Sequence, residues 1–389
     1  MRICHVTPHL PPDQAANALL PYHLGRWARE AGDEPVYIAH PPRLARAGTP
    51  AWTLPGTVTM VPTTRPAGPV SRFLKLGSLA AARRIATAAG PVIAGADLVH
   101  IHSNGLLPEY CARLAHRAGK PVVLTLYGTE IWHYRRRWLG PDLFTNAYRR
   151  ADAVTFYSRG LLDYGVGRGL DRPGLHVVYP PIANEFQTAT REAQLGARAS
   201  LGITAGRLLL NVKRLHPLAG QRVLIDAMPA IVAAHPDTLL VVCGTGPLAE
   251  DLAAAVRERG MERHVRLAGL VDNATVAVYN RAADLFVLPS RLEACPTVAL
   301  EALACGTPVV SSDNPGGVEL HGLFGEDVAV VPKENPEALG RAVVAALDQP
   351  RRTTAATREV LERDFRPAAV SFNYYSVYRS VLDARRTGA

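Results

Sequence analysis

The chain has 389 residues, 48% of them hydrophobic and 20% charged, so it is long enough for two or three packed domains. Its formal net charge of +9 suits an anionic ligand such as a nucleotide or a phosphate. Five cysteines without framework spacing, no secretion signal and no run of about 18 apolar residues exclude a disulfide-rich scaffold and predict a cytoplasmic protein.

Short apolar, β-rich runs alternate with helix-compatible stretches along the first half of the chain. The expected strands cover residues 2–8, 34–40, 58–63, 97–103, 121–127, 153–158 and 176–181. Such alternation predicts parallel strands joined by crossover helices. We therefore expect a doubly wound, Rossmann-like domain over residues 1–185.

Polar and small side chains interrupt this rhythm after residue 182, and we expect a linker over 186–204. The alternation then restarts, which predicts a second doubly wound domain over 205–365. Its expected strands cover residues 207–213, 238–244, 264–270, 285–290, 308–313 and 328–332. The tail, 366–389, has apolar and aromatic residues at helical spacing, so we expect a helix that packs back near the junction of the domains.

Three segments raise other functions. The basic run "WHYRRRWLG", 132–140, stands alone rather than in a stripe with interleaved aromatics, so nucleic acid is not an expected partner. The segment 70–86 has some basic amphipathic character, which leaves weak membrane association open. "CGTGPL", 243–248, is a weak dinucleotide fingerprint, but it follows the second strand of its half, which argues against a nicotinamide enzyme.

Two carboxylates, Glu293 and Glu301, lie eight positions apart in "PSRLEACPTVALEALACGTPVV", residues 289–310, just after an expected buried strand. Thr297 is the expected N-cap of a helix over 298–304. The free amides at the start of such a helix favour a phosphate. An ionised glutamate accepts hydrogen bonds from hydroxyl groups, so the two carboxylates are candidates for binding a sugar and a ribose.

This segment resembles the E-x7-E element of the retaining glycosyltransferases of the GT-B fold, sequence family 4. The segments "MRICHVTPHLPP", "DLVHIHS", "NVKRL", "CGTGPL" and "AADLFVLPS" resemble other parts of the same family, so the resemblance spans nearly the whole chain. It implies an α/β GT-B architecture in which two Rossmann-like domains face a cleft. The first domain is expected to bind the acceptor and the second the nucleotide-sugar donor.

The resemblance implies that Arg214 binds the donor diphosphate, where a guanidinium stabilises the charge of the departing group. It also implies that Glu301 holds the ribose and Glu293 the donor sugar. The family's Lys five positions after this Arg is replaced by Ala219, and Lys213, His216 or Arg222 are candidates for its role. The expected donor-binding residues are Lys213, Arg214, Gly244, Thr245, Gly246, Leu270, Glu293, Ala294, Cys295, Pro296, Thr297, Val298 and Glu301.

In the first half, Ala15, Ala16 and Asn17 replace the family's Gly-Gly loop, and Tyr127 replaces its usual His. A neutral phenol is no base near pH 7, but it donates a hydrogen bond. The expected acceptor-binding residues are Gln14, Ala16, Asn17, His102, Tyr127 and Glu130, and Glu130 is also a candidate base. The expected catalytic residues are Arg214, Glu293, His102 and Tyr127.

We therefore expect a retaining hexosyltransferase that moves a sugar from a GDP- or UDP-type donor to a small-molecule acceptor, in a pathway such as aminoglycoside or lincosamide biosynthesis. No Asp-x-Asp occurs and no His, Cys or carboxylate cluster has metal-ligand spacing, so neither a metal nor another cofactor is expected. A lipid or polysaccharide acceptor, a sugar-phosphate epimerase or phosphorylase, and a non-catalytic nucleotide-sugar binder stay open. A homodimer also stays open.

Overall fold

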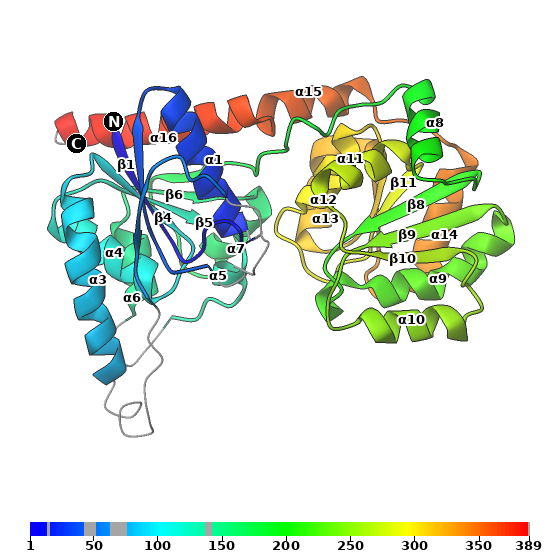
Figure 1. Cartoon of the computed structure of the whole chain (residues 1–389), viewed down its shortest axis with the longest axis horizontal. Coiled ribbons are helices and arrows are strands. Elements are labelled where there is room, and N and C mark those ends of the chain that lie inside the picture. The colour runs from blue at the N-terminus through cyan, green and yellow to red at the C-terminus, as the bar shows by residue number, and fades with distance from the viewer. Residues whose placement is uncertain (14–15, 43–51, 63–75, 137–141, 388–389) are drawn as a thin grey trace. The chain divides into compact units, whose positions relative to one another are not determined.

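The computed structural model describes residues 1–13, 16–42, 52–62, 76–136 and 142–387, which form two compact units. Unit 1 comprises Met1–Val178 and Ser371–Ala389, and unit 2 comprises Tyr179–Val370. Each unit contains one parallel β-sheet with helices packed against it (Figure 1). The prediction of an α/β chain with two doubly wound, Rossmann-like domains is confirmed.

The sheet of unit 1 has the strand order β3-β2-β1-β4-β5-β6-β7. Because β1 lies between β2 and β4, the strand order reverses at β1 and β4. The strands are β1 (Arg2–Thr7), β2 (Glu34–Ala39), β3 (Thr57–Met60), β4 (Leu98–His102), β5 (Val122–Leu126), β6 (Ala153–Phe156) and β7 (Leu175–Val177). The helices are α1 (Ala16–Glu30), α3 (Leu76–Ala94), α4 (Leu106–Arg117), α5 (Thr129–Trp132), α6 (Leu143–Arg150) and α7 (Arg159–Gly167).

The C-terminal helix α16 (Pro367–Thr387) returns to unit 1, as expected from its aromatic spacing. The Tyr375 hydroxyl donates to Asp33 Oδ2 (2.7 Å), and Arg385 Nε pairs with Asp152 Oδ1 (2.8 Å). The hydroxyl of Tyr378 also meets His100 Nδ1 of β4 (2.7 Å). The helix therefore covers one face of the unit 1 sheet.

The sheet of unit 2 has the strand order β10-β9-β8-β11-β12-β13, so its order reverses at β8 and β11. The strands are β8 (Arg207–Val212), β9 (Thr238–Cys243), β10 (Val265–Gly269), β11 (Leu285–Leu288), β12 (Val309–Ser312) and β13 (Val328–Val331). The helices are α8 (Arg191–Ser200), η1 (Pro217–Ala219), α9 (Gln221–Ala234), α10 (Ala249–Glu258), α11 (Asn273–Ala282), α12 (Thr297–Ala304), α13 (Pro315–Phe324), η2 (Gly325–Asp327), α14 (Pro336–Asp348) and α15 (Ala355–Asp364).

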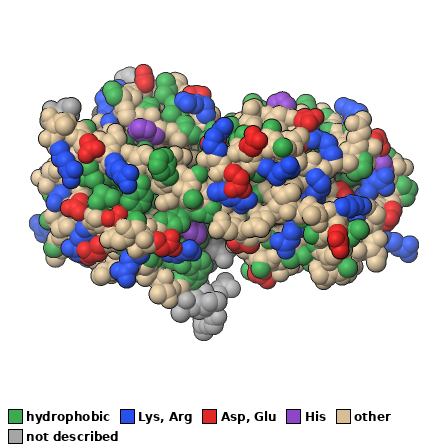
Figure 2. Space-filling model, turned by 90° about the horizontal axis from the view of Figure 1, so that it is seen from above, with side chains coloured by type: hydrophobic (Ala, Val, Ile, Leu, Met, Phe, Trp, Pro, Cys, Tyr) green, Lys and Arg blue, Asp and Glu red, His purple; other side chains and the backbone are tan. Residues whose placement is uncertain are grey.

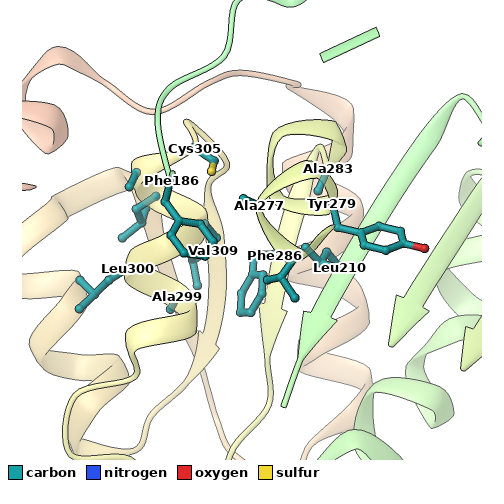
Figure 3. Close-up of a cluster of buried hydrophobic side chains, with 14 of the residues drawn as sticks. Phe186, Leu210, Ala277, Tyr279, Ala283, Phe286, Ala299, Leu300, Cys305 and Val309 are labelled. Atoms are coloured by element: carbon teal, nitrogen blue, oxygen red, sulfur yellow. The ribbon is translucent and has the colours of Figure 1, made fainter. Parts of the chain in front are cut away.

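Both faces of the unit 2 sheet are buried, which explains why its strands are largely apolar on both sides. Leu208 and Leu210 point to the face that packs against α11, α12, α13 and α15, and Figure 3 shows part of that cluster, including Leu210 and Phe286. Leu209 points to the opposite face, which packs against α9, α10 and α14. The alternation of neighbouring leucines follows from the two-residue period of a strand.

The expected linker, residues 186–204, includes α8, which packs on α11 of unit 2. The Gln194 side-chain amide donates to Ala283 O (3.1 Å), and Arg198 Nε donates to Ala282 O (2.9 Å). Residues 191–200 thus contribute to unit 2, and the division between the units falls at Val178 and Tyr179.

Charges of both signs are interspersed on the face shown in Figure 2, where Lys and Arg side chains lie among Asp and Glu side chains. Ion pairs of unit 2 include Arg222 with Asp226 (3.1 Å) and Arg291 with Glu334 (2.7 Å). At least one partner of each pair is exposed to solvent, so each pair contributes at most about 1 kcal/mol to stability. The basic residues that bear on function lie in the cavities and loops described below.

Candidate active site

The expected donor residues of unit 2 lie where the strand order reverses. Lys213 and Arg214 directly follow β8, and Glu293 lies in the loop after the neighbouring strand β11. The carboxyl ends of parallel strands share one edge of the sheet, and ligands of doubly wound sheets bind at such reversal points. The topology therefore brings these three residues to one edge of unit 2.

An ion pair joins the two loops. Lys213 Nζ lies 2.6 Å from Glu293 Oε1, and the two side chains are 28% and 12% exposed. A half-buried pair at this distance is stronger than a surface pair because water screens it less. Both residues were predicted from the sequence to bind the donor, but their ion pair was not predicted, because it depends on the adjacency of β8 and β11.

Arg214 lies beside this ion pair in the chain, but its side chain is exposed. Its carbonyl oxygen accepts a hydrogen bond from Gln221 Nε2 (3.2 Å), a side chain that is 1% exposed. No carboxylate of the described residues forms an ion pair with the Arg214 guanidinium. The backbone of Arg214 is thus fixed while its charge stays available to an anion.

The other two candidates for the missing family Lys are engaged elsewhere. Arg222 pairs with Asp226 and with Glu258 (3.2 Å), and His216 Nδ1 accepts a hydrogen bond from the amide of Leu218 (3.3 Å). Ala219 itself is buried, with 3% exposure. Lys213, in contrast, forms an ion pair with Glu293, another expected donor residue.

Helix α12 begins one residue earlier than expected. Thr297 is its first residue and Pro296 occupies the N-cap position, so the prediction of Thr297 as N-cap is wrong. The Pro296 carbonyl accepts from the amide of Ala299 (3.0 Å), and no side chain of the described residues caps this end. The amides of Thr297 and Val298 therefore lack intrahelical partners and can bind an anion.

Two glycines allow the loops to approach closely. A Cβ on Gly316, at the start of α13, would lie 2.9 Å from Glu293 Cβ, and the Gly316 amide donates to Glu293 O (3.0 Å). A Cβ on Gly244, after β9, would lie 2.0 Å from Lys213 O, and Gly244 has a φ of 146°. The positions of Lys213 and Glu293 therefore both depend on glycine neighbours.

Gly244→Ala is expected to lower the free energy of unfolding by about 1–3 kcal/mol, because it combines a strained φ with a backbone clash. It should also weaken nucleotide binding by displacing Lys213. Gly260→Ala is the matched control, because Gly260 has a φ of 64° but an added Cβ there meets nothing within 4 Å. Urea denaturation of both variants checks the expectation, and equal losses would contradict a specific role for close approach.

The second carboxyl, Glu301, lies in the second turn of α12. Burial raises the pKa of Glu301 to about 8, with Glu185 raising it further and Lys213 opposing the shift. The carboxyl is therefore mostly protonated at pH 7, contrary to the ionised state assumed from the sequence. A protonated carboxyl both donates and accepts, which still suits the hydroxyls of a ribose.

Glu301→Gln is expected to raise the free energy of unfolding at alkaline pH. The folded pKa lies above the unfolded value, so the stability that the wild-type proton confers is complete below about pH 4.5 and lost as the pH rises to about 8. The difference in free energy of unfolding between the variant and wild type should therefore increase between pH 5 and 8, to the order of a few kcal/mol. Denaturation across this range checks it, and a pH-independent difference would contradict the raised pKa.

The remaining donor candidates border these loops. Gly246 touches the backbone of Leu215, whose amide donates to Thr245 O (3.0 Å), and Leu270, after β10, is 79% exposed. Burial raises the pKa of the Cys295 thiol, and Glu319 and Glu293 raise it further, which agrees with a packing residue rather than a nucleophile. Glu319 accepts a hydrogen bond from the Tyr179 hydroxyl (3.1 Å).

In unit 1, a cavity of about 640 Å³ lies at the corresponding reversal of strand order. Pro8 and His9 follow β1, Ser103 follows β4, and all three line the cavity. Four expected acceptor residues also line it: Ala16, Asn17, Tyr127 and Glu130. Gln14, the remaining loop candidate, lies outside the described residues.

His102 does not line this cavity, contrary to the expectation that it faces the ligand. It is fully buried, with its Nδ1 2.8 Å from the Tyr127 hydroxyl and its Nε2 3.1 Å from His5 Nδ1. Burial lowers the pKa of His102, with the neighbouring His100 and His5 as further causes, so the ring is neutral. His102 is placed to position Tyr127 rather than to contact an acceptor.

Glu130 lines the cavity but is already engaged. Its carboxylate accepts hydrogen bonds from the Ser103 hydroxyl (2.5 Å), the Gly128 amide (2.9 Å) and the Tyr127 amide (3.3 Å). These bonds occupy both oxygens, which argues against Glu130 as the base. Its evident role is to fix the loop that presents Tyr127.

Sequence reasoning missed two histidines of this cavity. His9 Nδ1 lies 3.1 Å from Asp13 Oδ2, and Asp13 is 5% exposed. His40, after β2, meets Val61 O through its Nδ1 (2.7 Å). The spacing of His9 and Asp13 in "PHLPPD" was the available signal, but only the turn between β1 and α1 brings them together.

The structure also assembles three histidines that are distant in sequence. One ring nitrogen of each of His5, His100 and His102 lies within 4.8 Å of the other two, a spacing that could hold a metal ion. It is the one such cluster among the described residues. However, His100 is bonded to Tyr378 and, through Nε2, to Thr125 Oγ1 (2.6 Å). These hydrogen bonds occupy ring nitrogens that a metal ion would need, so we interpret the cluster as a buried hydrogen-bond network. The spacing of the histidines in the sequence did not predict this grouping.

Comparison with solved structures gives the same two-unit fold. Anabaena Alr3699/HepE, crystallised in complex with UDP, aligns with a TM-score of 0.76 at 18% identity over 98% of this chain and 100% of that one. Sucrose-phosphate synthase from Thermosynechococcus elongatus aligns with a TM-score of 0.74 at 20% identity, over 99% and 100%. At these identities the likeness shows the fold.

Two family models cover most of the chain. Residues 21–186 match the model described as Glycosyltransferase Family 4, and residues 197–362 match the model described as Glycosyl transferases group 1. The chain belongs to the family 4 glycosyltransferases of the GT-B fold. The resemblance first seen around Glu293 and Glu301 is thereby confirmed.

Curated members of this glycosyltransferase family match part of the chain. A GDP-mannose-dependent α-(1-6)-phosphatidylinositol monomannoside mannosyltransferase of Mycolicibacterium smegmatis is 30% identical over 254 residues, 62% of this chain and 65% of that protein. A D-inositol 3-phosphate glycosyltransferase of Jonesia denitrificans is 34% identical over 187 residues, 46% and 44%. The chain thus spans less than two thirds of the length of either relative.

No described helix is both long and apolar enough to cross a bilayer.

Proposed function

We propose that the chain is a retaining glycosyltransferase that moves a sugar from a nucleoside diphosphate sugar to a small hydroxyl-bearing acceptor. The observation that carries the proposal is the Lys213–Glu293 ion pair at the reversal point of the unit 2 sheet, next to the exposed Arg214 and the uncapped start of α12. The proposal assigns the donor to unit 2 and the acceptor to the cavity of unit 1.

Each donor group has a matching partner in this arrangement. The diphosphate accepts hydrogen bonds from the amides of Thr297 and Val298, and the positive charge of the Arg214 guanidinium stabilises its negative charge. The donor sugar hydroxyls contact Glu293, whose carboxylate Lys213 orients. The ribose hydroxyls contact Glu301, which both donates and accepts when protonated.

In the proposed reaction, the acceptor oxygen attacks the anomeric carbon on the face that the diphosphate leaves. The bond from the anomeric carbon to the phosphate oxygen breaks, the new glycosidic bond forms, and the acceptor proton passes to the departing phosphate oxygen. No protein nucleophile takes part, which agrees with the raised pKa of Cys295. Arg214 and the helix amides supply the charge stabilisation, so the proposal requires no metal ion.

A small polar acceptor suits the unit 1 cavity. Its volume of about 640 Å³ falls in the range of small-molecule sites, and His9, Asn17 and Tyr127 supply groups that bond hydroxyls. The named relatives act on phosphatidylinositol monomannoside and on inositol phosphate, so a polyol acceptor is the first class to test. A natural-product acceptor and a lipid acceptor form the other arms of the same panel.

A thermal-shift screen against UDP-, GDP-, ADP- and dTDP-sugars tests the donor first, because a bound donor stabilises the native state by mass action. The stabilising donor is then incubated with polyol, aminoglycoside and lipid acceptors, and the product anomer is read by NMR. Retention of the donor configuration is expected. Tight donor binding without transfer to any acceptor would favour a non-catalytic binder, and donor turnover without an acceptor would favour an epimerase or a phosphorylase.

A further inference from the structure

A second cavity of unit 2, of about 390 Å³, lies at the opposite edge of the sheet from the donor loops. Arg207, the first residue of β8, lines it, whereas Lys213 follows the last residue of the same strand. Asp284, just before β11, also lines it. A six-residue strand is about 20 Å long, so the cavity is separate from the donor residues.

Positive charge in this cavity exceeds negative charge. Asp284 is fully engaged, since it pairs with Arg198 and accepts from the Leu208 amide (2.7 Å) and from Gln194 Nε2 (3.2 Å). Arg351 pairs with the buried Asp327. These two carboxylates therefore neutralise Arg198 and Arg351.

Three further arginines line the cavity: Arg191, Arg207 and Arg352. Within the described part of the chain, none of the three has a carboxylate within ion-pair distance. Arg191 donates only to the Gln194 side-chain oxygen (2.6 Å). The cavity thus holds three arginines that form no ion pair within the described residues.

Arg352 shows that this charge is partly withdrawn from water. Its guanidinium donates to Ala283 O (3.0 Å) and to Cys305 O, while its buried Nε has no partner among the described residues. Burial lowers the pKa of Arg352, Cys305 and Asp284 partly oppose this shift, and the charges of Arg191 and Arg198 add to it. Uncompensated cations in a partly dry cavity are costly, and a bound anion would relieve that cost.

The remaining wall is apolar, formed by Ala346, Leu347 and Pro350 at the end of α14. We propose that this cavity binds a sugar phosphate, with Arg191, Arg207 and Arg352 facing its phosphate and the apolar wall facing its carbon skeleton. A phosphate monoester carries close to two negative charges at neutral pH, which three guanidinium groups match. The volume lies within the range of small-molecule sites. This site is independent of the proposed donor and acceptor sites.

Isothermal titration of the full chain with glucose 6-phosphate tests the proposal, with glucose and inorganic phosphate as parallel probes. One saturable site is expected for the sugar phosphate, weaker binding for phosphate and none for glucose. Arg207→Glu should weaken binding at least about tenfold, and Arg207→Gln should give a smaller loss. Arg341→Glu, which reverses an exposed charge on α14 outside this cavity, should leave the affinity unchanged.

UDP binding by the Arg207 variants verifies that unit 2 remains folded and that the donor site is intact. Arg214→Glu separates the two sites, because it should weaken UDP binding and leave glucose 6-phosphate binding unchanged. The proposal is overturned if no saturation occurs up to about 10 mM, if Arg214→Glu abolishes the binding, or if phosphate alone binds as tightly as the sugar phosphate.

Discussion

Arg214→Ala is expected to lower kcat for sugar transfer by about 10²–10³-fold, the size of effect that follows removal of one group aimed at developing charge. The diphosphate gains negative charge as the glycosidic bond breaks, and Arg214 is the cation next to the donor loops that carries no ion pair among the described residues. Because its contribution grows in the transition state, kcat should fall more than KM rises. Steady-state kinetics at saturating donor and acceptor measure the effect.

The folded state should tolerate Arg214→Ala, because the side chain is exposed and the Gln221 hydrogen bond goes to the Arg214 backbone. The melting temperature should therefore remain that of wild type. Arg341→Ala is the matched control, since it removes an exposed arginine from α14 of the same unit. A variant that keeps wild-type kcat, or that loses activity only by unfolding, would contradict the assigned role.

Glu293→Ala is expected to lower kcat/KM by about 10²–10³-fold, because it removes the donor-sugar contact and leaves the Lys213 ammonium without its partner. Lys213→Met should give a smaller loss, since the carboxylate remains but is no longer oriented. The activity of both single variants and of the double variant, measured with the same donor, gives the coupling between the two residues.

The double variant should be about as slow as Glu293→Ala alone, since Lys213 acts through Glu293. Additive losses would mean that Lys213 contacts the donor separately, for example at the diphosphate in place of the family's missing Lys. The control is Arg291→Ala, because Arg291 lies in the same loop but pairs with the exposed Glu334 (2.7 Å). A loss of activity in that control as large as in Glu293→Ala would contradict a specific role for the Lys213–Glu293 pair.

The strands and the positions of the site loops could be predicted because they depend on local signals. Apolar runs mark each buried strand, and residues such as Arg214 and Glu293 lie in the loops that follow those strands. Parallel topology then sends all such loops to one edge of the sheet. The resemblance to family 4 added the roles proposed for these residues, which spacing alone could not supply.

The predictions that the structure does not support concern residues whose surroundings come from distant segments of the chain. His102 ends a strand, like a site residue, but its hydrogen bonds to His5 and Tyr127 hold it inside the unit. Glu130 has the chemistry of a base, but Ser103 and the backbone amides of its own loop occupy its oxygens. The state of Glu301 depends on burial, which composition does not reveal.

The prediction of where α12 starts was wrong for a different reason. Thr is a preferred N-cap residue, so the sequence pointed to Thr297. In the structure the preceding loop is tied to α13 through the Gly316 amide and Glu293 O (3.0 Å), and Pro296 takes the extended conformation of the N-cap. A tertiary contact thus overrides the local preference by one residue.

Hydrogen–deuterium exchange of the full chain with and without a saturating nucleoside diphosphate tests most directly whether the donor binds at the reversal point of the unit 2 sheet. The account predicts slower exchange in the segments 213–222, 243–248 and 293–301, with little change in the unit 2 helices α10 and α14. Saturated binding that leaves those three segments unprotected, or that protects only the loops of unit 1, would contradict it.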